Sequence, residues 1–354
     1  CRAPARGKLR VLRVHRAFCT FLQGGSGFRR AAGESFFIVR LTHVLSPAHA
    51  PSGSNLARAQ ATAFEAIRRA VLYTRAVCPE IQVDVVTPVH DVDRPAVPTV
   101  SDAAPRLARN LLDVTDIRPA RPLPLIGDVL RAGVQAGRGE VIIYTNVDIS
   151  PMPGFYELVV RLLRDHPGFA IARRILTSEP MDPAELPTMY AQLGRRSFGL
   201  DTFVCPREVA SAIDLGEVAI GLPCVEFAVM GAIDAACGFR AEIYRYLHAN
   251  FHHGIDRVWK KYQALGDWNR QRACALLDRL MHAHAPVPPR SVLATCFHCA
   301  HDRRPPRRAR LERLMISLGL RKRYPEPFDL VPDPLVGNGF GRMPLNEITG
   351  EGVA

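Results

Sequence analysis

The sequence lacks several features that would place it in a common class. It has no run of about 18 apolar residues, the length that a membrane-spanning helix needs. It has no phosphate-binding loop of the Gly-x-x-x-x-Gly-Lys type. Its 9 cysteines are odd in number and scattered over 354 residues, which indicates unpaired thiols and not a disulfide framework. The apolar fraction of 47% is ordinary for a globular protein with a sizeable core.

Acidic residues are few relative to basic ones. The chain has 46 Lys and Arg against 34 Asp and Glu, a net charge of +12 and a pI of about 9.6. This balance favours an anionic partner, such as a nucleotide, a phosphorylated lipid headgroup or a nucleic acid. Nucleic acid is the least favoured, because no known binding module and no aromatic residues interleaved with basic ones are present.

The first acidic residue is Glu34. We interpret residues 1–34 as a basic, disordered N-terminal arm, with a transit-type leader as the alternative. The sequence begins at Cys1 and not at Met, which is compatible with a fragment or a processed product, and the compartment is left open.

Strand and helix patterns alternate from residue 35 onward. Short apolar runs rich in β-branched and aromatic residues predict strands, and apolar residues at helical spacing predict helices between them. The predicted strands are 35–45, 81–89, 140–144 and 168–176, and the predicted helices are 55–77, 125–137 and 153–166. We therefore predict an α/β fold, a Rossmann-like, mostly parallel sheet with helices on both faces. Residues 141–144 have no polar alternation, which fits a strand covered on both sides.

The second half of the chain is less regular. It predicts a strand followed by a helix start within 200–213, a buried helix from about Val225, and a loop with three histidines between a strand and a helix within 239–265. Past Pro286 the composition becomes rich in Pro and Arg. We predict a catalytic-type domain over 35–285 and a basic C-terminal extension over 286–354, with one short helix near 307–318 that docks on the domain or contacts an anionic membrane surface. The segment CFHCAH carries metal-ligand residue types, but its spacing is cramped for zinc and no second ligand pair follows.

The stretch EVIIYTNVDIS places two polar side chains at a strand end. Asn146 and Asp148 follow the apolar strand at once and are two residues apart, so that both can point the same way. In open α/β sheets, ligands bind beyond the carboxyl ends of the strands. Carboxylate and amide oxygens suit Mg²⁺ or Mn²⁺, which keep several waters and complete their shell with substrate phosphates.

The segment VIIYTNVDI resembles the Asp-x-Asp segment of GT-A fold glycosyltransferases, which use nucleotide-sugar donors. The resemblance covers roughly residues 36–262. It implies a GT-A-like domain in which Asp148 binds the metal that holds the donor pyrophosphate, while Asn146 stands where the first acid of the motif is expected. It also implies a late histidine as a further metal ligand, a role open to His252 or His253. The alternatives are that Asp148 caps the next helix and that the histidines pack in the fold.

Two carboxylates are candidates for the acceptor side. Glu226 lies in an otherwise apolar segment, where burial would raise its pKa toward that of a useful base. Asp201 precedes an apolar strand and could bind an acceptor hydroxyl. A buried ion pair is the alternative for Glu226, and a turn or cap is the alternative for Asp201. Arg173 and Arg174 lie at a strand end, where either could meet phosphate.

The sequence therefore predicts a divalent-metal-assisted glycosyltransferase with a nucleotide-sugar donor and a glycan, lipid or protein acceptor of unknown identity. A nucleotidyltransferase on a similar sheet is the alternative within enzymes. A non-catalytic binding protein that retains the fold is the alternative outside them, and Asn146 is the observation that motivates it.

Overall fold

The structure is a computed structural model that describes residues 38–118, 121–176, 182–253 and 263–301. The chain divides into two units, 1–301 and 302–354, and every described residue lies in the first. The N-terminal arm, Asp256 and Arg257 beside the histidines, and the helix predicted at 307–318 lie outside the described residues.

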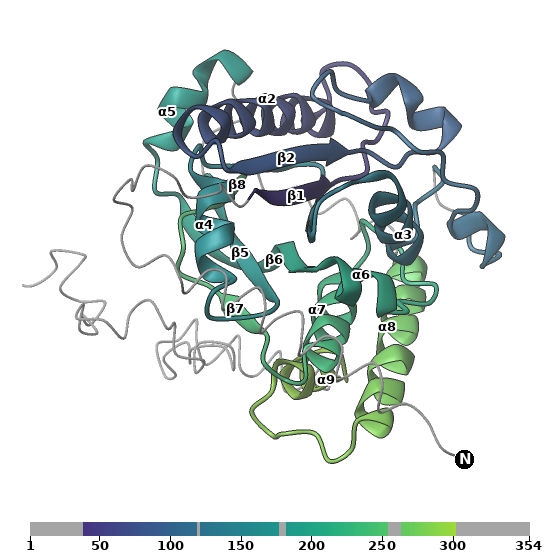
Figure 1. Ribbon diagram of the computed structural model, residues 1–354. Coiled ribbons are helices and arrows are strands. Elements are labelled where there is room, and N and C mark those ends of the chain that lie inside the picture. The colour runs from purple at the N-terminus through teal and green to yellow at the C-terminus, as the bar shows by residue number, and fades with distance from the viewer. Residues whose placement is uncertain (1–37, 119–120, 177–181, 254–262, 302–354) are drawn as a thin grey trace, which may run out of the picture. The chain divides into compact units, whose positions relative to one another are not determined.

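A mixed sheet of eight strands forms the centre of the described unit (Figure 1). Its order is β2-β1-β3-β6-β5-β8-β4, and β7 pairs with β5 off this path. The β2–β1, β1–β3, β5–β8 and β5–β7 pairs are parallel, and the β3–β6, β5–β6 and β4–β8 pairs are antiparallel. The strands are β1 (Val39–Val44), β2 (Ile81–Val86), β3 (Val141–Thr145), β4 (Ile149–Pro151), β5 (Phe169–Leu176), β6 (Arg195–Pro206), β7 (Glu242–Tyr244) and β8 (Asn250–His253).

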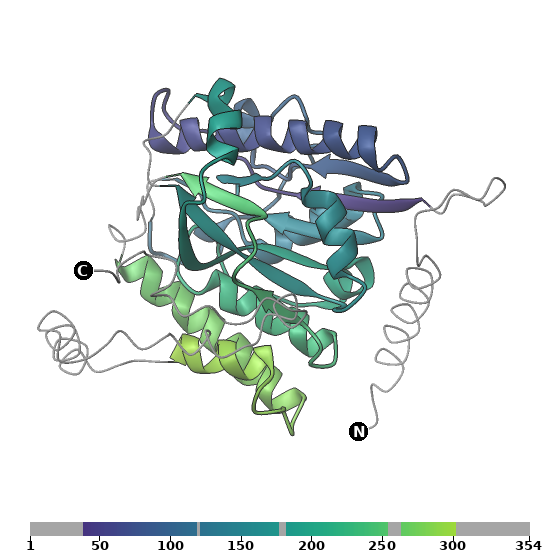
Figure 2. The same ribbon diagram turned by 90° about the vertical axis from the view of Figure 1, so that its left-hand side faces the viewer.

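Helices cover both faces of this sheet, which confirms the predicted α/β class. Figure 2 shows α2 along one side of the sheet and α8 with α9 on the other. Three short 3-10 turns, Asp91–Ala96, Leu111–Asp113 and Pro183–Glu185, lie in the connections. The helices are α2 (Asn55–Val77), α3 (Ile126–Ala136), α4 (Phe155–Leu162), α5 (Leu186–Tyr190), α6 (Arg207–Ala212), α7 (Val225–Ala236), α8 (Gln263–Ala283) and α9 (Val292–His301).

Side-chain alternation along β1 divides the core between the two faces. Leu41 packs in one cluster with Phe155, Val159 and other residues of α4, whereas Val44 lies against Gly133 of α3 on the opposite face. A Cβ on Gly133 would lie 2.5 Å from a methyl carbon of Val44, so this close approach of helix and strand requires a glycine. β3 is buried at all its residues, as the apolar run of 141–144 predicts.

Helix α2 has the predicted bounds, Asn55–Val77. Ser54 is its N-cap, and its hydroxyl accepts a hydrogen bond from the backbone N–H of Ala57 at 3.2 Å. The side chain of Asn55, the first residue of the helix, accepts a hydrogen bond from Arg58.

The helix predicted over 153–166 is present as α4, within two residues of its expected start, but a strand separates it from Asp148. A short strand, β4, follows directly, and α4 begins only at Phe155 with Gly154 as its N-cap and no side-chain capping bond. Residues 149–151 are extended because they pair with β8, a contact between segments about 100 residues apart that no local pattern reveals. Asp148 is therefore not a helix cap.

The C-terminal part of the described unit is a packed group of three helices. α7 contacts β5 and β6, and α8 and α9 pack against α7 and against each other. The buried carboxylate of Asp234 in α7 accepts a hydrogen bond from the backbone N–H of Leu293 at 2.8 Å, at the start of α9. CFHCAH belongs to α9, where Cys296 is buried. None of the described helices combines the length and the apolar character needed to cross a membrane.

Candidate functional site

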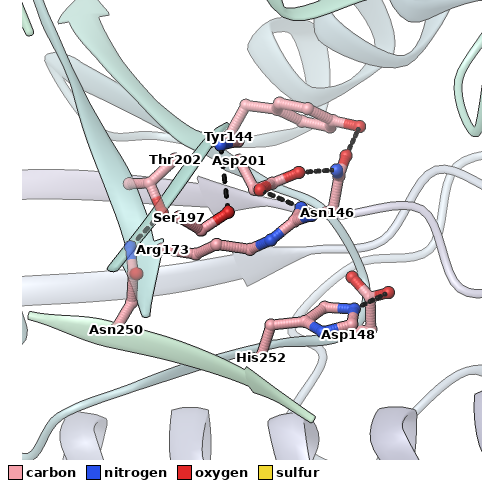
Figure 3. A network of polar contacts seen from close by, with 10 residues as sticks. Tyr144, Asn146, Asp148, Arg173, Ser197, Asp201, Thr202, Asn250 and His252 are labelled. Carbon is pink, nitrogen blue, oxygen red and sulfur yellow. Dashed lines mark hydrogen bonds and ion pairs between the residues drawn. The ribbon is translucent and has the colours of Figure 1, made fainter. Parts of the chain in front are cut away.

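Polar and charged side chains converge beyond the carboxyl end of β3 (Figure 3). They come from the turn after β3, from β5, β6 and β8, and from the first turn of α7. We call them the strand-end cluster: Asn146, Asp148, Arg173, Asp201, Glu226 and His252. The topology explains the convergence, because β6 runs beside β3, β5 beside β6, and β8 beside β5.

Asn146 is held on both sides of its amide. Its backbone N–H donates to the carbonyl oxygen of Asp201 at 3.1 Å. Its side-chain NH₂ donates to the Asp201 carboxylate. Its side-chain oxygen accepts a hydrogen bond from the hydroxyl of Tyr144 at 3.0 Å, and burial holds the pKa of that hydroxyl well above its ordinary value, so the hydroxyl is a donor. These contacts fix which way the amide points.

Arg173 links Asp201 to the rest of the cluster. Its guanidinium donates to the second oxygen of the Asp201 carboxylate. Gly199 of β6 makes room for it, because a Cβ there would lie 2.8 Å from Cζ of Arg173. Although burial acts to lower the pKa of Arg173, the charges of Asp201 and Asp148 outweigh it and raise that pKa. A fixed, partly exposed cation thus lies between two carboxylates.

Asp148 and His252 form the second pair of the cluster. Nε2 of His252 lies 2.9 Å from Oδ2 of Asp148, and the His252 side chain is 10% exposed against 26% for Asp148. Burial alone would raise the pKa of Asp148, but the charge of His252, the hydrogen bond to its ring and the charge of Arg173 hold it below its ordinary value. Burial would lower the pKa of His252, but Asp148 raises it.

The Asp148–His252 pair fits one edge of a divalent-metal shell. Neighbouring ligand atoms of an octahedral Mg²⁺ with bonds of about 2.0–2.1 Å are about 3 Å apart, close to the 2.9 Å between these two donor atoms. Nothing among the described residues fixes the tautomer of the ring, because Nδ1 of His252 is buried without a hydrogen-bond partner there. In the described part of the chain, no group of three or more His, Cys, Asp or Glu side chains could hold a metal. A metal here would therefore take most of its shell from water and substrate.

Glu226 faces the cluster from the first turn of α7. Its carboxyl group is partly buried, and burial together with the charge of Asp201 raises its pKa to about 7, against the opposing charges of Arg173 and Arg270. The residue before Val225 at the start of this helix, Cys224, has a φ of 73°, a left-handed conformation that costs energy in a residue other than glycine. The chain thus brings a carboxyl group that titrates near neutrality to the edge of the cluster.

The described contacts bring neither Arg174 nor His248 into the cluster. Arg174 donates to the carbonyl oxygens of Leu193 and Gly194. His248 precedes β8 and is half-buried. For His253 only the backbone is described; it ends β8, so this histidine and His252 belong to a strand and not to the predicted loop. They are extended because β8 is held between β4 and β5.

Tyr144 and the residues behind the cluster were not identified from the sequence. Nδ1 of His43 lies 2.8 Å from the hydroxyl of Tyr156, and Nε2 of His43 lies 2.9 Å from the hydroxyl of Thr145. We call His43, Thr145 and Tyr156 the inner polar trio; all are at most 1% exposed. The signal for Tyr144 was its position near the end of β3, two residues before Asn146, which the apolar character of the run concealed.

Comparison with known sequences gives no relative. No protein-family model matches the chain, and no curated protein matches it.

Comparison with solved structures finds distant similarities. Glucosyl-3-phosphoglycerate synthase from Mycobacterium tuberculosis, in complex with Mn²⁺, UDP-glucose and phosphoglyceric acid, is 14% identical with a TM-score of 0.40, over 72% of this chain and 86% of that one. Mannosyl-3-phosphoglycerate synthase from Rubrobacter xylanophilus is 12% identical with a TM-score of 0.41, over 71% and 79%. S. aureus TarS in complex with UDP-GlcNAc is 7% identical with a TM-score of 0.42, over 68% and 66%.

Proposed function

We propose that the protein is a glycosyltransferase that moves a sugar from a nucleotide-sugar donor to an acceptor hydroxyl with the help of Mn²⁺ or Mg²⁺. The observation that carries this proposal is the Asp148–His252 pair, 2.9 Å apart at the carboxyl end of the sheet, with Arg173 beside it. A carboxylate and an imidazole beside a guanidinium suit a diphosphate that is bound to a metal ion.

Asp148 and His252 would hold the metal, which when bound acts as a Lewis acid on the leaving diphosphate. His253, at the end of the same strand, stays a candidate for a further ligand. Asn146 would help to bind the nucleotide-sugar donor. Arg173 would place its positive charge close to the phosphates, where a charge-assisted hydrogen bond is stronger than a neutral one. Arg174, which the described contacts direct elsewhere, stays a weaker candidate for this role.

Glu226 is the better candidate for the base that serves the acceptor. Because its pKa is raised to about 7, it can take the proton of an acceptor hydroxyl near neutral pH. In that step the acceptor oxygen bonds to the sugar carbon, the bond from that carbon to the donor phosphate breaks, and the nucleoside diphosphate leaves. Asp201 is less suited to be a base, because Asn146 and Arg173 occupy both oxygens of its carboxylate.

The acceptor is a glycan, a lipid or a protein in this proposal. The chain's net charge of +12 suits an acceptor or surface that carries negative charge.

The test is product analysis with a panel of UDP-, GDP-, ADP- and dTDP-sugars and Mn²⁺. We expect release of a nucleoside diphosphate from one donor, dependent on the metal and slower in Asp148→Ala. Release of pyrophosphate from a nucleoside triphosphate and a sugar phosphate would instead support a nucleotidyltransferase. No metal-dependent turnover of any donor, with or without added acceptors, would support a binding protein.

A further inference from the structure

Asn146 and Asp201 face each other, one with a side-chain amide and the other with a carboxylate. The backbone N–H of Asn146 donates to the carbonyl of Asp201 at 3.1 Å, so the two positions are fixed relative to each other. The side-chain amide of Asn146 donates to the carboxylate of Asp201, a residue that is 5% exposed. Tyr144 and Arg173 close the two ends of this chain of hydrogen bonds.

We propose that Asn146 and Asp201 are a coupled pair: the residue at position 146 is an amide because the residue at position 201 is a carboxylate. The asparagine is then no sign of lost chemistry. It is the donor that a neighbouring buried carboxylate requires, and both are positioning residues for Asp148, which lies two residues after Asn146. The link to Asp148 rests on the proposed function; the pairing itself does not.

A carboxylate at both positions would be unfavourable. Two like charges would be in direct contact in a largely buried place, with Arg173 as the one guanidinium that contacts them among the described residues. An amide at both positions would leave the guanidinium of Arg173 without its carboxylate, which is costly for a partly buried charge. Each single exchange between acid and amide is therefore expected to weaken the site.

Exchanging both residues keeps each side-chain hydrogen bond in a mirrored form, and the carboxylate moves from position 201 to position 146, one side chain further from Arg173. The hydroxyl of Tyr144 still donates to an oxygen at position 146, the amide at position 201 donates to the carboxylate at position 146, and Arg173 donates to the amide oxygen at position 201. Asp and Asn have almost the same size, and the net charge is unchanged. The double exchange therefore isolates the pairing from steric effects.

The test compares the melting temperatures of the wild type, Asn146→Asp, Asp201→Asn and the double variant, all without metal or nucleotide. We expect each single variant to melt at least about 5 °C lower and the double variant to recover more than half of the summed loss, because contacting residues are not additive. A double variant that loses the sum of both single losses would overturn the proposal. Where a single variant does not fold, folding of the double variant gives the same answer.

The second readout is the rise in melting temperature caused by Mn²⁺ with a nucleoside diphosphate. We expect the rise to shrink in each single variant and to return in the double variant, and Tyr144→Phe to shrink it as well. Tyr156→Phe is the matched control, because it removes a buried hydroxyl that contacts His43 and not the cluster. Recovery of stability without recovery of the nucleotide effect would contradict the positioning role. If the wild type shows no nucleotide effect, the proposed function fails, and the ligand-free comparison still decides the pairing.

Discussion

The strand-end cluster and the inner polar trio are both polar groups in the same sheet, and they differ in charge and exposure. Thr145 of the trio directly precedes Asn146 of the cluster. Each ring nitrogen of His43 has a hydroxyl partner, and burial lowers the pKa of this histidine to about 3, so the trio is neutral and internally satisfied. The cluster instead gathers charged groups, and the side chain of Arg173 is 27% exposed.

This difference separates a structural role from a chemical one. A buried polar group that is fully hydrogen-bonded holds strands in register and offers nothing to a ligand. Partly exposed charges whose pKa values shift in opposite directions mark a functional site with greater probability. Asp148 has a lowered pKa and Glu226 a raised one, whereas the trio contains no group that carries charge at neutral pH. Variants in the cluster should therefore change donor binding or turnover, and variants in the trio should change stability alone.

Removal of the metal-ligand candidate is expected to have the largest effect. Asp148→Ala should lower the rate of donor consumption by about 10²–10³-fold, because a divalent ion supplies several kcal/mol of leaving-group stabilisation. The measurement is the initial rate at saturating Mn²⁺. Asp84→Asn is the control. The buried Asp84 carboxylate is not part of the cluster; it accepts one hydrogen bond from Thr42 and one from the backbone N–H of Arg138, each 3.0 Å long, so its loss should reduce stability and not turnover. A retained rate in Asp148→Ala would place the metal site elsewhere.

Glu226→Gln is expected to be the next largest loss. Removing this general base should cost about 10²-fold in rate, the lower end of the usual range for such groups, and the wild-type kcat/KM should rise with pH through about 7, the pKa to which burial raises this group. Glu157→Gln, a change on the exposed side of α4, is the control. A wild-type profile that is flat between pH 6 and 8 would argue against Glu226 as the base.

Glu226→Gln should raise the stability of the protein at high pH, although it lowers the rate. The folded protein holds this proton more tightly than the unfolded chain, since the pKa is raised from 4.5 to about 7. The stability that protonated Glu226 contributes is therefore present below the unfolded pKa and is lost as the pH rises through the folded pKa. Glu226→Gln should thus melt higher than the wild type at pH 8 and similarly at pH 4. A variant that is less stable than the wild type at pH 8 would indicate a structural ion pair instead.

Gly199→Ala probes the placement of Arg173 with a moderate expected effect. The added Cβ would lie 2.8 Å from Cζ of Arg173, so the guanidinium must shift away from its present position. A displaced charge of this kind should raise the KM for the donor by about tenfold. Gly127→Ala is the control, because its Cβ would have its nearest contact at an ordinary 3.6 Å. Equal kinetics for the two variants would mean that Arg173 does not contact the donor.

The smallest effect on activity is expected from the trio. Tyr156→Phe leaves a ring nitrogen of His43 without its partner and should reduce the free energy of unfolding by about 1–3 kcal/mol, while the nucleotide effect on melting stays unchanged. Because the pKa of His43 falls from 6.5 to about 3 on folding, its contribution to stability is present above the unfolded pKa and is lost as the pH drops below 6.5. Urea unfolding at pH 7.5 and pH 5 measures both. A loss of the nucleotide effect in Tyr156→Phe would remove the distinction between trio and cluster.

The sequence predicted those features of the fold that depend on local pattern. The helical spacing of apolar residues fixed α2 over Asn55–Val77, and the continuous apolar run gave β3. The same run placed Asn146 and Asp148 at a strand end, which is where the structure has them. Both features are encoded within a few residues.

The remaining features depend on contacts between distant segments. His252 was expected in a loop, and its strand exists only because β4 and β5 flank it. Asp201 pairs with Asn146 and Arg173, which are 55 and 28 residues away in sequence, so its pairing was not visible locally. Tyr144 was interpreted as an apolar strand residue, because a pattern of apolar residues does not show whether a tyrosine hydroxyl has a polar partner.

The assignment of the strand-end cluster as a donor site can be decided by the melting temperature of the wild type with a panel of nucleoside diphosphates, with and without Mn²⁺, beside Asp148→Ala. It predicts that one nucleotide, such as UDP or GDP, raises the melting temperature only when Mn²⁺ is present, and that Asp148→Ala abolishes this rise while Asp84→Asn keeps it. A wild type that no nucleotide stabilises, or a rise that persists without metal and in Asp148→Ala, would contradict the assignment of the strand-end cluster as a donor site.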